Sequence, residues 1–452
     1  MDDRANGVRP RKGFGALAIA AVGLAIAASE ARTAEPEFPA NRIFVRSYNL
    51  NAFERDLDGQ WQGITFASDG NCYFASSTHS ARHGGLFLKY DPRTGEVKPL
   101  CEDITRVCGE DPAKTPPQGK IHSPIVELDG WLYFATHLAN YWEEAAAAYT
   151  GAHVVGYEMA TGNFRDLGIV QPNYSIYSAI GLDAAGKKLY VFTVPFSKPV
   201  RERDGCHLWR VDLTSGAKTD LGLIQGASAC PWFLVDRNGD CWFGPRGLSG
   251  TLLCARAATG KIDRYENVLP GDDPPAEGKR ARRGSLDWVQ ALPDGDRCLV
   301  TMTHSRKLWI FDSTKQDDLT KAFLPVADIG SSDGITLGGD RVYYIGRPST
   351  GRPDKGFDLH LYSVSIAPGA QVVDHGLIMD QDGRRPWRIS SLATDGKGKV
   401  FMVGDWHLLT RVVRNGERVV RAPGEKGSMR HMRDDRYDEL WRAQFFAVVE
   451  VR

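Results

Sequence analysis

The sequence predicts an all-β fold, a seven-bladed β-propeller that forms one domain over residues 35–452. Three observations support this: a hairpin that recurs seven times, turn residues at matching places, and strand-like segments at both ends of the repeated region. Hairpin units that repeat every ~45–60 residues are typical of propeller blades, because one unit cannot bury both faces of its sheet alone. The hairpins occupy residues 63–77, 123–137, 179–195, 232–246, 288–304, 335–347 and 390–406.

Each hairpin has a tight turn followed by a strand rich in aromatic and β-branched side chains. The turns lie near Asp69, Asp129, Asp183, Asp236, Asp294, Gly339 and Asp395. A third and a fourth strand follow, often joined by Thr-Gly or Pro-Gly, which provide the positive-φ positions that tight hairpins need. Each unit therefore predicts one four-stranded blade.

The two ends of the repeated region also resemble strands. Residues 43–50 read IFVRSYNL, and residues 445–452 read FFAVVEVR. A ring of blades must close without leaving open strand edges. We therefore expect the two ends of the chain to share one blade.

Composition agrees with a turn-dense β fold, since the chain has 48 Gly, 24 Pro and 10% aromatic residues. Lys and Arg total 56, as do Asp and Glu, so no overall charge favours nucleic acid or an anionic membrane. We expect a monomer that has no nucleic-acid partner. Any selectivity for a charged ligand must arise from residues at the binding site.

The first 34 residues have the features of a signal peptide. Arg9, Arg11 and Lys12 precede an apolar run at 13–29, and small residues follow, with cleavage expected after Ala31 or Ala34. The run is short for a membrane-spanning anchor, which is the alternative. The sequence predicts a periplasmic or secreted protein, with no membrane span after cleavage.

Eight cysteines must then be interpreted for an oxidising compartment. Cys101 and Cys108 lie in one polar loop and are the best candidates for a disulfide. The others lie in or beside strands, where a buried free thiol is the commoner outcome.

Hairpin geometry brings polar residues from different blades to one face. The starts of the first and third strands and the ends of the second strands share an edge of each blade. First strands contribute His122, Tyr177 with Tyr174 nearby, Trp232, Asp287, Asp333 and Arg388. Second-strand ends contribute His79, His137, Arg246, His304, Arg347, Asp405 and His407. Third-strand starts contribute His153, His207, Lys307 and His360.

Eight of the eleven histidines fall at these positions. Singly, a histidine at a strand end is usually a hydrogen-bonded loop residue, but the centre of a propeller focuses whatever lines it. Arg suits carboxylate or sulfate, and aromatic rings suit sugar faces. We therefore expect an acidic polysaccharide or oligosaccharide as ligand. Its binding would involve His153, Tyr174, Trp232, His304, Arg347 and Arg388.

Such a pocket suits β-elimination from a uronate, because this reaction needs a proton acceptor, a proton donor and a cation beside the carboxylate. It requires neither a nucleophile nor a pair of carboxylates. A carboxylate-pair glycosidase is less favoured, since only Asp287, Asp333 and Asp405 lie at suitable positions.

Residues 119–137 (GKIHSPIVELDGWLYFATH) and 151–168 (GAHVVGYEMATGNFRDLG) resemble secreted bacterial seven-bladed propellers that include polysaccharide lyases of the ulvan lyase and rhamnosyl-glucuronate lyase type. The resemblance implies a catalytic His in the blade of residues 121–137, a second His, a Tyr from the next blade and an Arg. By position these are His122, His137 or His153, Tyr177 or Tyr174, and Arg246. It also implies that a metal can be present.

On this interpretation His122 and Tyr177 share the base and acid roles, while Arg246 and His137 hold the carboxylate. Two other functional hypotheses stay open. One is a non-catalytic propeller that binds glycan or protein, since fold does not determine function. The other is a metal-dependent enzyme of another kind, with a histidine cluster as ligands of Mn, Zn or Fe, whereas a divalent metal in the lyase would be Ca, Mn or Zn. That cluster would draw on His122, His137, His153 and His304.

Overall fold

The computed structural model describes residues 41–271, 283–330, 332–347, 359–367, 369–407, 411–414, 417–420 and 442–451. These residues belong to one compact unit, Ala40–Arg452. The predicted signal peptide lies outside them and stays a prediction. Within the described residues, no helix has both the length and the apolar character needed to cross a membrane.

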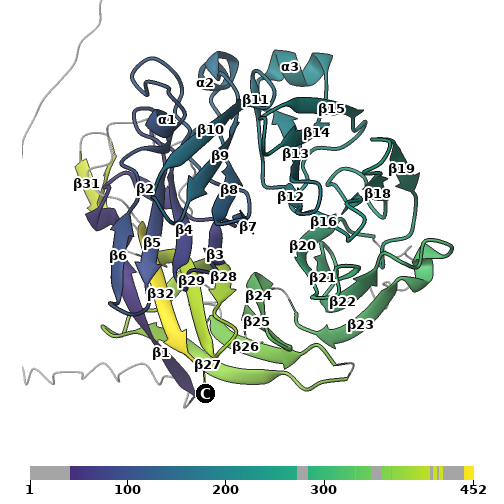
Figure 1. The fold of residues 1–452 in the computed structure, drawn as a ribbon. Coiled ribbons are helices and arrows are strands. Elements are labelled where there is room, and N and C mark those ends of the chain that lie inside the picture. Colours follow the sequence, from purple (N-terminus) through teal and green to yellow (C-terminus); the bar gives the residue numbers. More distant parts are fainter. Residues whose placement is uncertain are drawn as a thin grey trace, which may run out of the picture. The chain divides into compact units, whose positions relative to one another are not determined.

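Five of the sheets each form one blade, and the blades follow one another in sequence order around a centre (Figure 1). Blade 1 comprises β2 (Leu57–Gly59), β3 (Ile64–Phe66), β4 (Cys72–Thr78), β5 (Leu86–Asp91) and β6 (Glu96–Pro99). Blade 2 comprises β7 (Val126–Leu128), β8 (Trp131–Ala135), β9 (His153–Glu158) and β10 (Phe164–Ile169). Blade 3 comprises β11 (Tyr174–Ser175), β12 (Ile180–Asp183), β13 (Lys188–Pro195), β14 (His207–Asp212) and β15 (Lys218–Leu223).

Blades 4 and 5 have the same order of strands. Blade 4 comprises β16 (Leu234–Val235), β17 (Cys241–Phe243), β18 (Leu252–Ala255) and β19 (Ile262–Tyr265). Blade 5 comprises β20 (Leu286–Ala291), β21 (Arg297–Met302), β22 (Lys307–Asp312) and β23 (Phe323–Asp328). Short helical segments occur between strands: α1 (Ile104–Val107), α2 (Glu143–Ala148), α3 (Lys198–Arg203), and the 3-10 turns Leu50–Ala52 and Leu319–Lys321.

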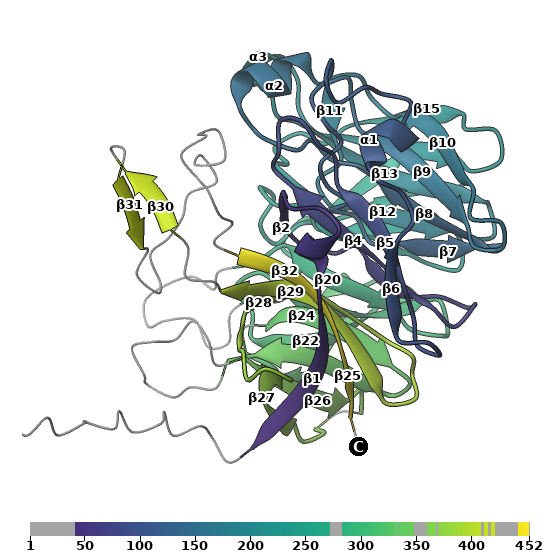
Figure 2. The ribbon, with the colours of Figure 1, turned by 90° about the vertical axis from the view of Figure 1, so that its left-hand side faces the viewer.

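An eight-stranded sheet provides the remaining two blades. Blade 6 comprises β24 (Ser332–Gly338), β25 (Arg341–Gly346), β26 (His360–Ser365) and β27 (Val373–Asp380). Blade 7 comprises β28 (Pro386–Thr394), β29 (Lys399–His407), β32 (Arg442–Glu450) and β1 (Arg42–Asn49). A separate hairpin, β30 (Arg411–Arg414) and β31 (Glu417–Val420), lies apart from the blade sheets in Figure 2.

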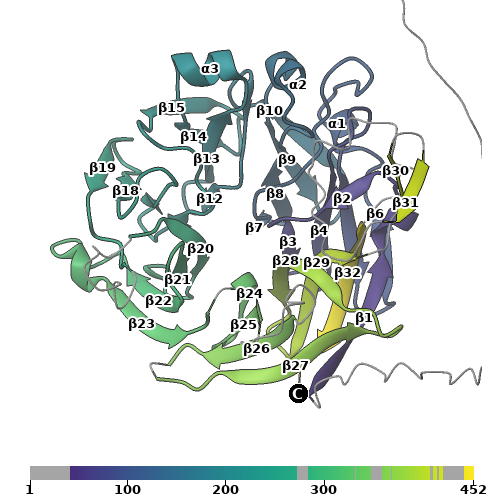
Figure 3. The ribbon, with the colours of Figure 1, turned by 180° about the vertical axis from the view of Figure 1, so that it is seen from behind.

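The two chain ends share blade 7, as predicted. Residues 46–49 of β1 pair antiparallel with β32, and residues 42–45 pair in parallel with β27. Figures 2 and 3 show β1 running alongside β32 at this edge. One long strand therefore covers the edge of blade 7 and joins it to blade 6, which removes exposed hydrogen-bonding edges.

Apolar packing between blades closes the ring. The described residues form seven buried clusters, and each cluster joins two neighbouring blades. The closing cluster packs Phe74 of blade 1 against Phe401 and Phe446 of blade 7, with the Phe74 and Phe446 ring centroids 4.4 Å apart. The predicted all-β, seven-bladed propeller is confirmed.

Two expectations about cysteine have different outcomes. Cys101 and Cys108 are both free thiols in the structure, so the predicted disulfide is not formed. Cys108 instead lies against His153 and packs in the cluster between blades 1 and 2. The six other cysteines are buried and free, as expected for thiols in strands.

Candidate functional site

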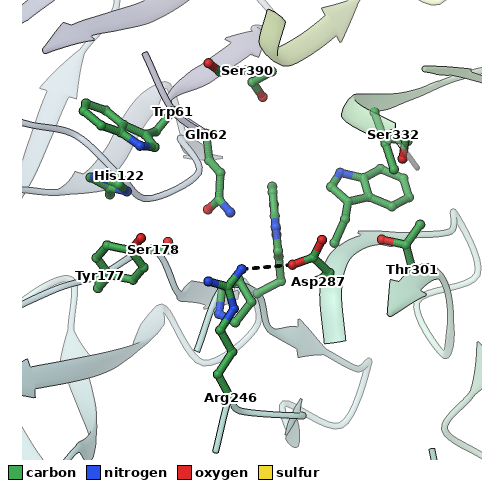
Figure 4. A pocket seen from close by; sticks show the side chains of 15 residues that line it. Trp61, Gln62, His122, Tyr177, Ser178, Arg246, Asp287, Thr301, Ser332 and Ser390 are labelled. Carbon is green, nitrogen blue, oxygen red and sulfur yellow. Dashed lines mark hydrogen bonds and ion pairs between the residues drawn. The ribbon is translucent and has the colours of Figure 1, made fainter. Parts of the chain in front are cut away.

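The first strand of every blade contributes to one pocket at the centre of the ring, with a volume of about 180 Å³ (Figure 4). Residues from all seven blades line it: Trp61, Gln62, His122, Tyr177, Ser178, Pro231, Trp232, Arg246, Asp287, Trp288, Thr301, Ser332, Ile335, Ser390 and Ser391. Of the predicted site residues, His122, Tyr177, Arg246 and Trp232 are brought together here. The geometry of the first strands was therefore anticipated correctly.

An irregularity in each first strand turns these residues toward the centre. In blades 1 and 3 the strand breaks in two, between β2 and β3 and between β11 and β12. In blades 2 and 4 a single bridge, at Lys120 and at Ala229, precedes the strand by several residues. In blades 5, 6 and 7 the pairing register shifts at the lining residues. Such bulges redirect side chains and are common beside functional sites.

One wall of the pocket is a stack of rings (Figure 4). The imidazole of His122 stacks on Trp61 at 4.1 Å between centroids, and the Tyr177 ring lies 4.8 Å from it. His122 is only 2% exposed, and its Nε2 has no hydrogen-bond partner among the described residues. Burial lowers the pKa of His122 well below its usual range. The side chain is therefore a neutral imidazole near neutral pH.

An ion pair crosses the pocket on the other side. Arg246 Nη2 lies 3.0 Å from Asp287 Oδ1, and both side chains are more than 40% exposed, at 44% and 42%. Gln62 connects the two sides when its amide is oriented to satisfy both ends. It then donates to the His122 carbonyl oxygen at 3.1 Å and accepts from Trp232 Nε1 at 2.9 Å.

His137 lies behind His122 and does not line the pocket. The two ring centroids are 4.7 Å apart, which agrees with the prediction that both lie on the same side of blade 2. His137 is fully buried, with Nδ1 2.6 Å from Ser175 Oγ and Nε2 2.8 Å from the Tyr141 hydroxyl. Both of its nitrogens are occupied, so the predicted direct contact with a substrate carboxylate does not fit this position.

A buried lysine completes this region. Lys120 is fully buried, its Nζ donates to the carbonyl oxygens of Leu138 (2.8 Å) and Ala139, and it lies 4.1 Å from the Tyr141 ring centroid. Burial lowers the pKa of this ammonium well below its usual range. Lys120 thereby connects the segment before β7, which carries His122, to the segment after β8.

The three third-strand histidines have different surroundings. His153, His207 and His360 each place Nδ1 at 2.9–3.3 Å from a fourth-strand aspartate: Asp166, Asp220 and Asp374. Each aspartate also accepts from the backbone N–H of a glycine two residues later. None of these histidines lines the central pocket. The gathering of histidines at strand ends is thus partly a structural repeat, which corrects the assignment of His153 to substrate binding.

The other predicted binding residues also lie outside the central pocket. The Tyr174 hydroxyl donates to Asp204 at 2.7 Å, and Arg388 Nη2 pairs with the buried Asp405 at 3.2 Å. Arg347 is exposed. The side chains of Asp333 and His407 lie outside the described part of the structure.

His304 lines a second pocket of about 370 Å³, which shares Asp287, Thr301 and Ser332 with the first. His304 has φ 68°, in the left-handed region that side chains other than glycine seldom adopt.

The predicted metal cluster of four histidines does not form. Among the described residues, one group has the arrangement of ligand atoms that a metal ion needs: Cys108, His153 and Asp166, with atoms within 4.8 Å of one another. Of the four histidines, only His153 belongs to it.

Several site residues were not predicted from the sequence. Trp61 and Gln62 precede the first hairpin just as His122 precedes the second, so the same alignment of repeats contains the signal that would have found them. The serines of blades 6 and 7 carry no such signal, because serine is common in loops.

No family model matches the chain, and no curated protein matches it. Solved structures are similar in fold. The chain is 12% identical to a chain of the mitotic checkpoint complex, with a TM-score of 0.47, and covers 96% of that chain with 85% of its own. It is 12% identical to the β-propeller domain of Cps50 (Swd1) from Myceliophteria thermophila, with a TM-score of 0.48, covering 93% of that chain with 77% of its own.

A third structure, an oligogalacturonate lyase from Vibrio parahaemolyticus, is 10% identical with a TM-score of 0.47. The alignment covers 97% of that chain and 90% of this one. At these identities the likeness concerns the β-propeller architecture alone, and assigns neither a family nor an activity.

Proposed function

We propose that this protein is a secreted or periplasmic lyase that cleaves a uronic-acid-containing polysaccharide by β-elimination. One observation carries the proposal: a buried, neutral imidazole, a phenol and a guanidinium, from His122, Tyr177 and Arg246, line one small pocket. These are the three kinds of group that elimination beside a carboxylate requires.

In the proposed reaction, His122 accepts the C5 proton of the uronate. The electron pair of the C5–H bond forms the C4–C5 double bond, and the C4–O4 bond breaks. Tyr177 donates a proton to the departing O4 and is reprotonated by solvent or by His122. Atoms and charge balance without a co-reactant.

The low pKa of His122 is compatible with this role. A buried imidazole is a weak base while its surroundings are apolar, since desolvation opposes the charged form. A bound carboxylate beside it favours the imidazolium and raises the pKa toward neutrality. The base is therefore strengthened when substrate is present.

Arg246 would neutralise the uronate carboxylate, whose oxygens gain charge as the C5 proton leaves. In the free protein its partner is Asp287, at 3.0 Å and partly exposed to solvent. A substrate carboxylate competes with Asp287 for the guanidinium. Arg246 thus takes the carboxylate role alone, and His137 instead orients His122 from behind.

The shape and composition of the pocket support a sugar ligand. Trp61, Tyr177, Trp232 and Trp288 provide aromatic faces, and several serines provide hydroxyl groups. Asp287 is the one carboxylate that lines the pocket among the described residues. A glycosidase that needs two flanking carboxylates therefore has less support.

The test is incubation of purified protein with a panel of uronate polysaccharides while the ultraviolet absorbance of the unsaturated uronate is recorded. We expect release of unsaturated product from at least one polymer. If the protein binds such a polymer, by calorimetry, and forms no product at any pH or with any added divalent metal, it is a glycan-binding propeller instead.

A further inference from the structure

A second pocket adjoins the central one and has no role in the proposed reaction. It has a volume of about 370 Å³ and shares Asp287, Thr301 and Ser332 with the first pocket. In the view of Figure 4, Asp287 lies between Arg246 on one side and Thr301 and Ser332 on the other. The two pockets therefore border one another along blades 5 and 6.

The first pocket is small for a polymeric ligand. Its volume of about 180 Å³ is below the roughly 300–1,000 Å³ that is usual for small-molecule sites, whereas about 370 Å³ is within that range. A polysaccharide that reacts in the first pocket must continue beyond it. The three shared residues provide a path by which the chain extends into the second pocket.

Basic side chains dominate the second pocket. His304, Arg306 and Lys307 line it, and Asp287 is the one carboxylate that lines it among the described residues. Asp287 already pairs with Arg246 at 3.0 Å, so its charge is balanced from the side of the first pocket. The second pocket therefore has an excess of positive charge and suits an anionic group.

Arg306 is held weakly by its present partner. Its Nε lies 3.5 Å from Asp328 Oδ1, and the two side chains are 78% and 58% exposed. An ion pair in solvent contributes little, so a ligand anion can replace Asp328. The backbone beneath is fixed, because the Arg306 carbonyl oxygen accepts from the N–H groups of Ile329 at 2.8 Å and Gly330 at 3.1 Å.

His304 occupies the tight turn between β21 and β22. The Ser305 N–H donates to the Met302 carbonyl oxygen at 3.1 Å, and His304, the third residue of this turn, has φ 68°. Glycine or asparagine usually fills such a position. The His304 ring makes no hydrogen bond or ion pair with another residue of the described structure. A side chain that the turn disfavours, without a structural partner and beside a pocket, indicates a role in binding.

We propose that His304 and Arg306, assisted by the charge of Lys307, bind a second anionic group of the polymer, on a sugar residue next to the one in the first pocket. The inference rests on the proposed function, because the reacting uronate fixes where the chain lies. The group is a carboxylate or a sulfate ester, since both accept paired hydrogen bonds from a guanidinium. Asp287 repels an anion close to it, so the group lies beside Arg306 instead.

These contacts would act on binding and not on the chemical step. His304 and Arg306 do not line the first pocket, so they hold the neighbouring sugar equally in the substrate and in the transition state. Uniform binding of this kind lowers KM and leaves kcat unchanged. We therefore expect longer oligosaccharides to bind more tightly than a single uronate.

The test is calorimetry on the His122→Gln variant, which prevents turnover. The probes are galacturonate, tetragalacturonate, the chondroitin 4-sulfate tetrasaccharide and its desulfated form. We expect at least one tetrasaccharide to bind about tenfold or more tightly than galacturonate, because hydrogen bonds to charged groups contribute that much. Loss of this gain on desulfation identifies a sulfate, and a gain with tetragalacturonate identifies a carboxylate. If no tetrasaccharide exceeds the monomer, the proposal is wrong.

Variants in the same background then locate the contact. Arg306→Gln and His304→Gly should each weaken tetrasaccharide binding about 3–10-fold, with galacturonate binding unchanged. His304→Gly should not lower the unfolding temperature, since glycine adopts positive φ readily. Lys321→Gln is the matched control, because Lys321 is an exposed cation of blade 5 that pairs with Asp318 at 2.8 Å and does not line the pocket. Equal losses in the control would assign the effect to net charge and overturn the proposal.

The outcomes separate this inference from the lyase proposal. Unsaturated product whose KM is unaffected by Arg306→Gln, in a protein with an intact His122, overturns the role of the second pocket alone. Tetrasaccharide binding that depends on Arg306, with no product from any polymer, overturns the lyase and keeps the second pocket as part of a glycan-binding propeller.

Discussion

The first strands and the third strands both place histidines near one face of the propeller, yet their surroundings are opposite. His122 stacks between Trp61 and Tyr177 with no carboxylate bonded to it, and burial lowers its pKa well below the usual range. His207 lies between Asp204 and Asp220, which outweigh its partial burial and raise its pKa.

The difference follows from strand position. A third strand is paired on both sides, so its first residue meets the aspartate of the adjacent fourth strand. His122 lies just before the first strand of blade 2, at the centre of the ring, where no carboxylate of the described residues bonds to its ring. The carboxylate decides whether the histidine is a charged structural group or a neutral one able to exchange a proton.

The largest expected effect concerns the histidine of the pocket. His122→Gln should reduce elimination about 10²–10⁴-fold, since a positioned general base contributes that much. Initial rates of unsaturated product measure this, with polymer binding largely retained. The matched change His207→Gln in a third strand should leave the rate within about twofold of wild type. Equal losses in both variants would remove the distinction between the two classes.

Arg246 provides the next test. Arg246→Ala should lower the rate about 10²–10³-fold, because a preorganised donor that stabilises developing charge is lost. It should also raise KM. Asp287→Asn frees the guanidinium from its 3.0 Å partner, so we expect a lower KM for the uronate substrate. An unchanged or higher KM in Asp287→Asn would show that Asp287 itself binds substrate.

The pH dependence of stability should separate the pocket histidines from the rest. The pKa of His122 is lowered from 6.5 in the folded state. Above about pH 6.5 the imidazole is neutral in both the folded and the unfolded chain, so its titration does not change the stability there. Below that pH the unfolded chain gains a proton that the folded chain does not, and stability falls by up to about 1.4 kcal/mol per pH unit.

Urea unfolding between about pH 7 and about pH 5.5 measures this loss, and His122→Gln should reduce its slope. A slope that His122→Gln leaves unchanged would mean that His137, whose pKa burial also lowers, accounts for the loss instead.

The smallest effect is expected for the third-strand pair. The raised pKa of His207 stabilises the fold below its unfolded pKa near 6.5, and this contribution is lost as pH rises through the higher folded pKa. His207→Gln should cost roughly 0.5–1 kcal/mol at acidic pH, because the site is partly exposed and screened. Unfolding midpoints at acidic and alkaline pH test the sign, which is opposite to that for His122.

The repeat could be predicted from the sequence because it depends on local patterns. A blade is a pair of hairpins whose strands alternate apolar and polar residues or are fully apolar. In blade 2, the turn residues Asp129 and Gly130 have φ 51° and 81°, the positive values that a tight hairpin turn requires. The shared blade at the chain ends was also predictable, since two strand-like segments had no partner within any repeat. Local chemistry and closure of the ring together determine the architecture.

The site was predictable only in part. Aligned first strands brought His122, Tyr177 and Trp232 to one pocket, and aligned second-strand ends added Arg246. His153 and Tyr174 have the same residue types at comparable strand ends, yet aspartates on adjacent elements bind them. Strand-end position alone cannot separate these cases, because the partner lies 13 or 30 residues away in sequence.

By itself, the sequence determined seven blades, their turns and the set of strand ends that share a face, because these follow from periodicity and turn chemistry. The tertiary structure alone decided which histidines carry charge, that Asp287 holds Arg246, and that Cys108 adjoins His153 rather than Cys101. Those outcomes depend on distances between different strands and loops, and on how completely each polar atom is removed from water.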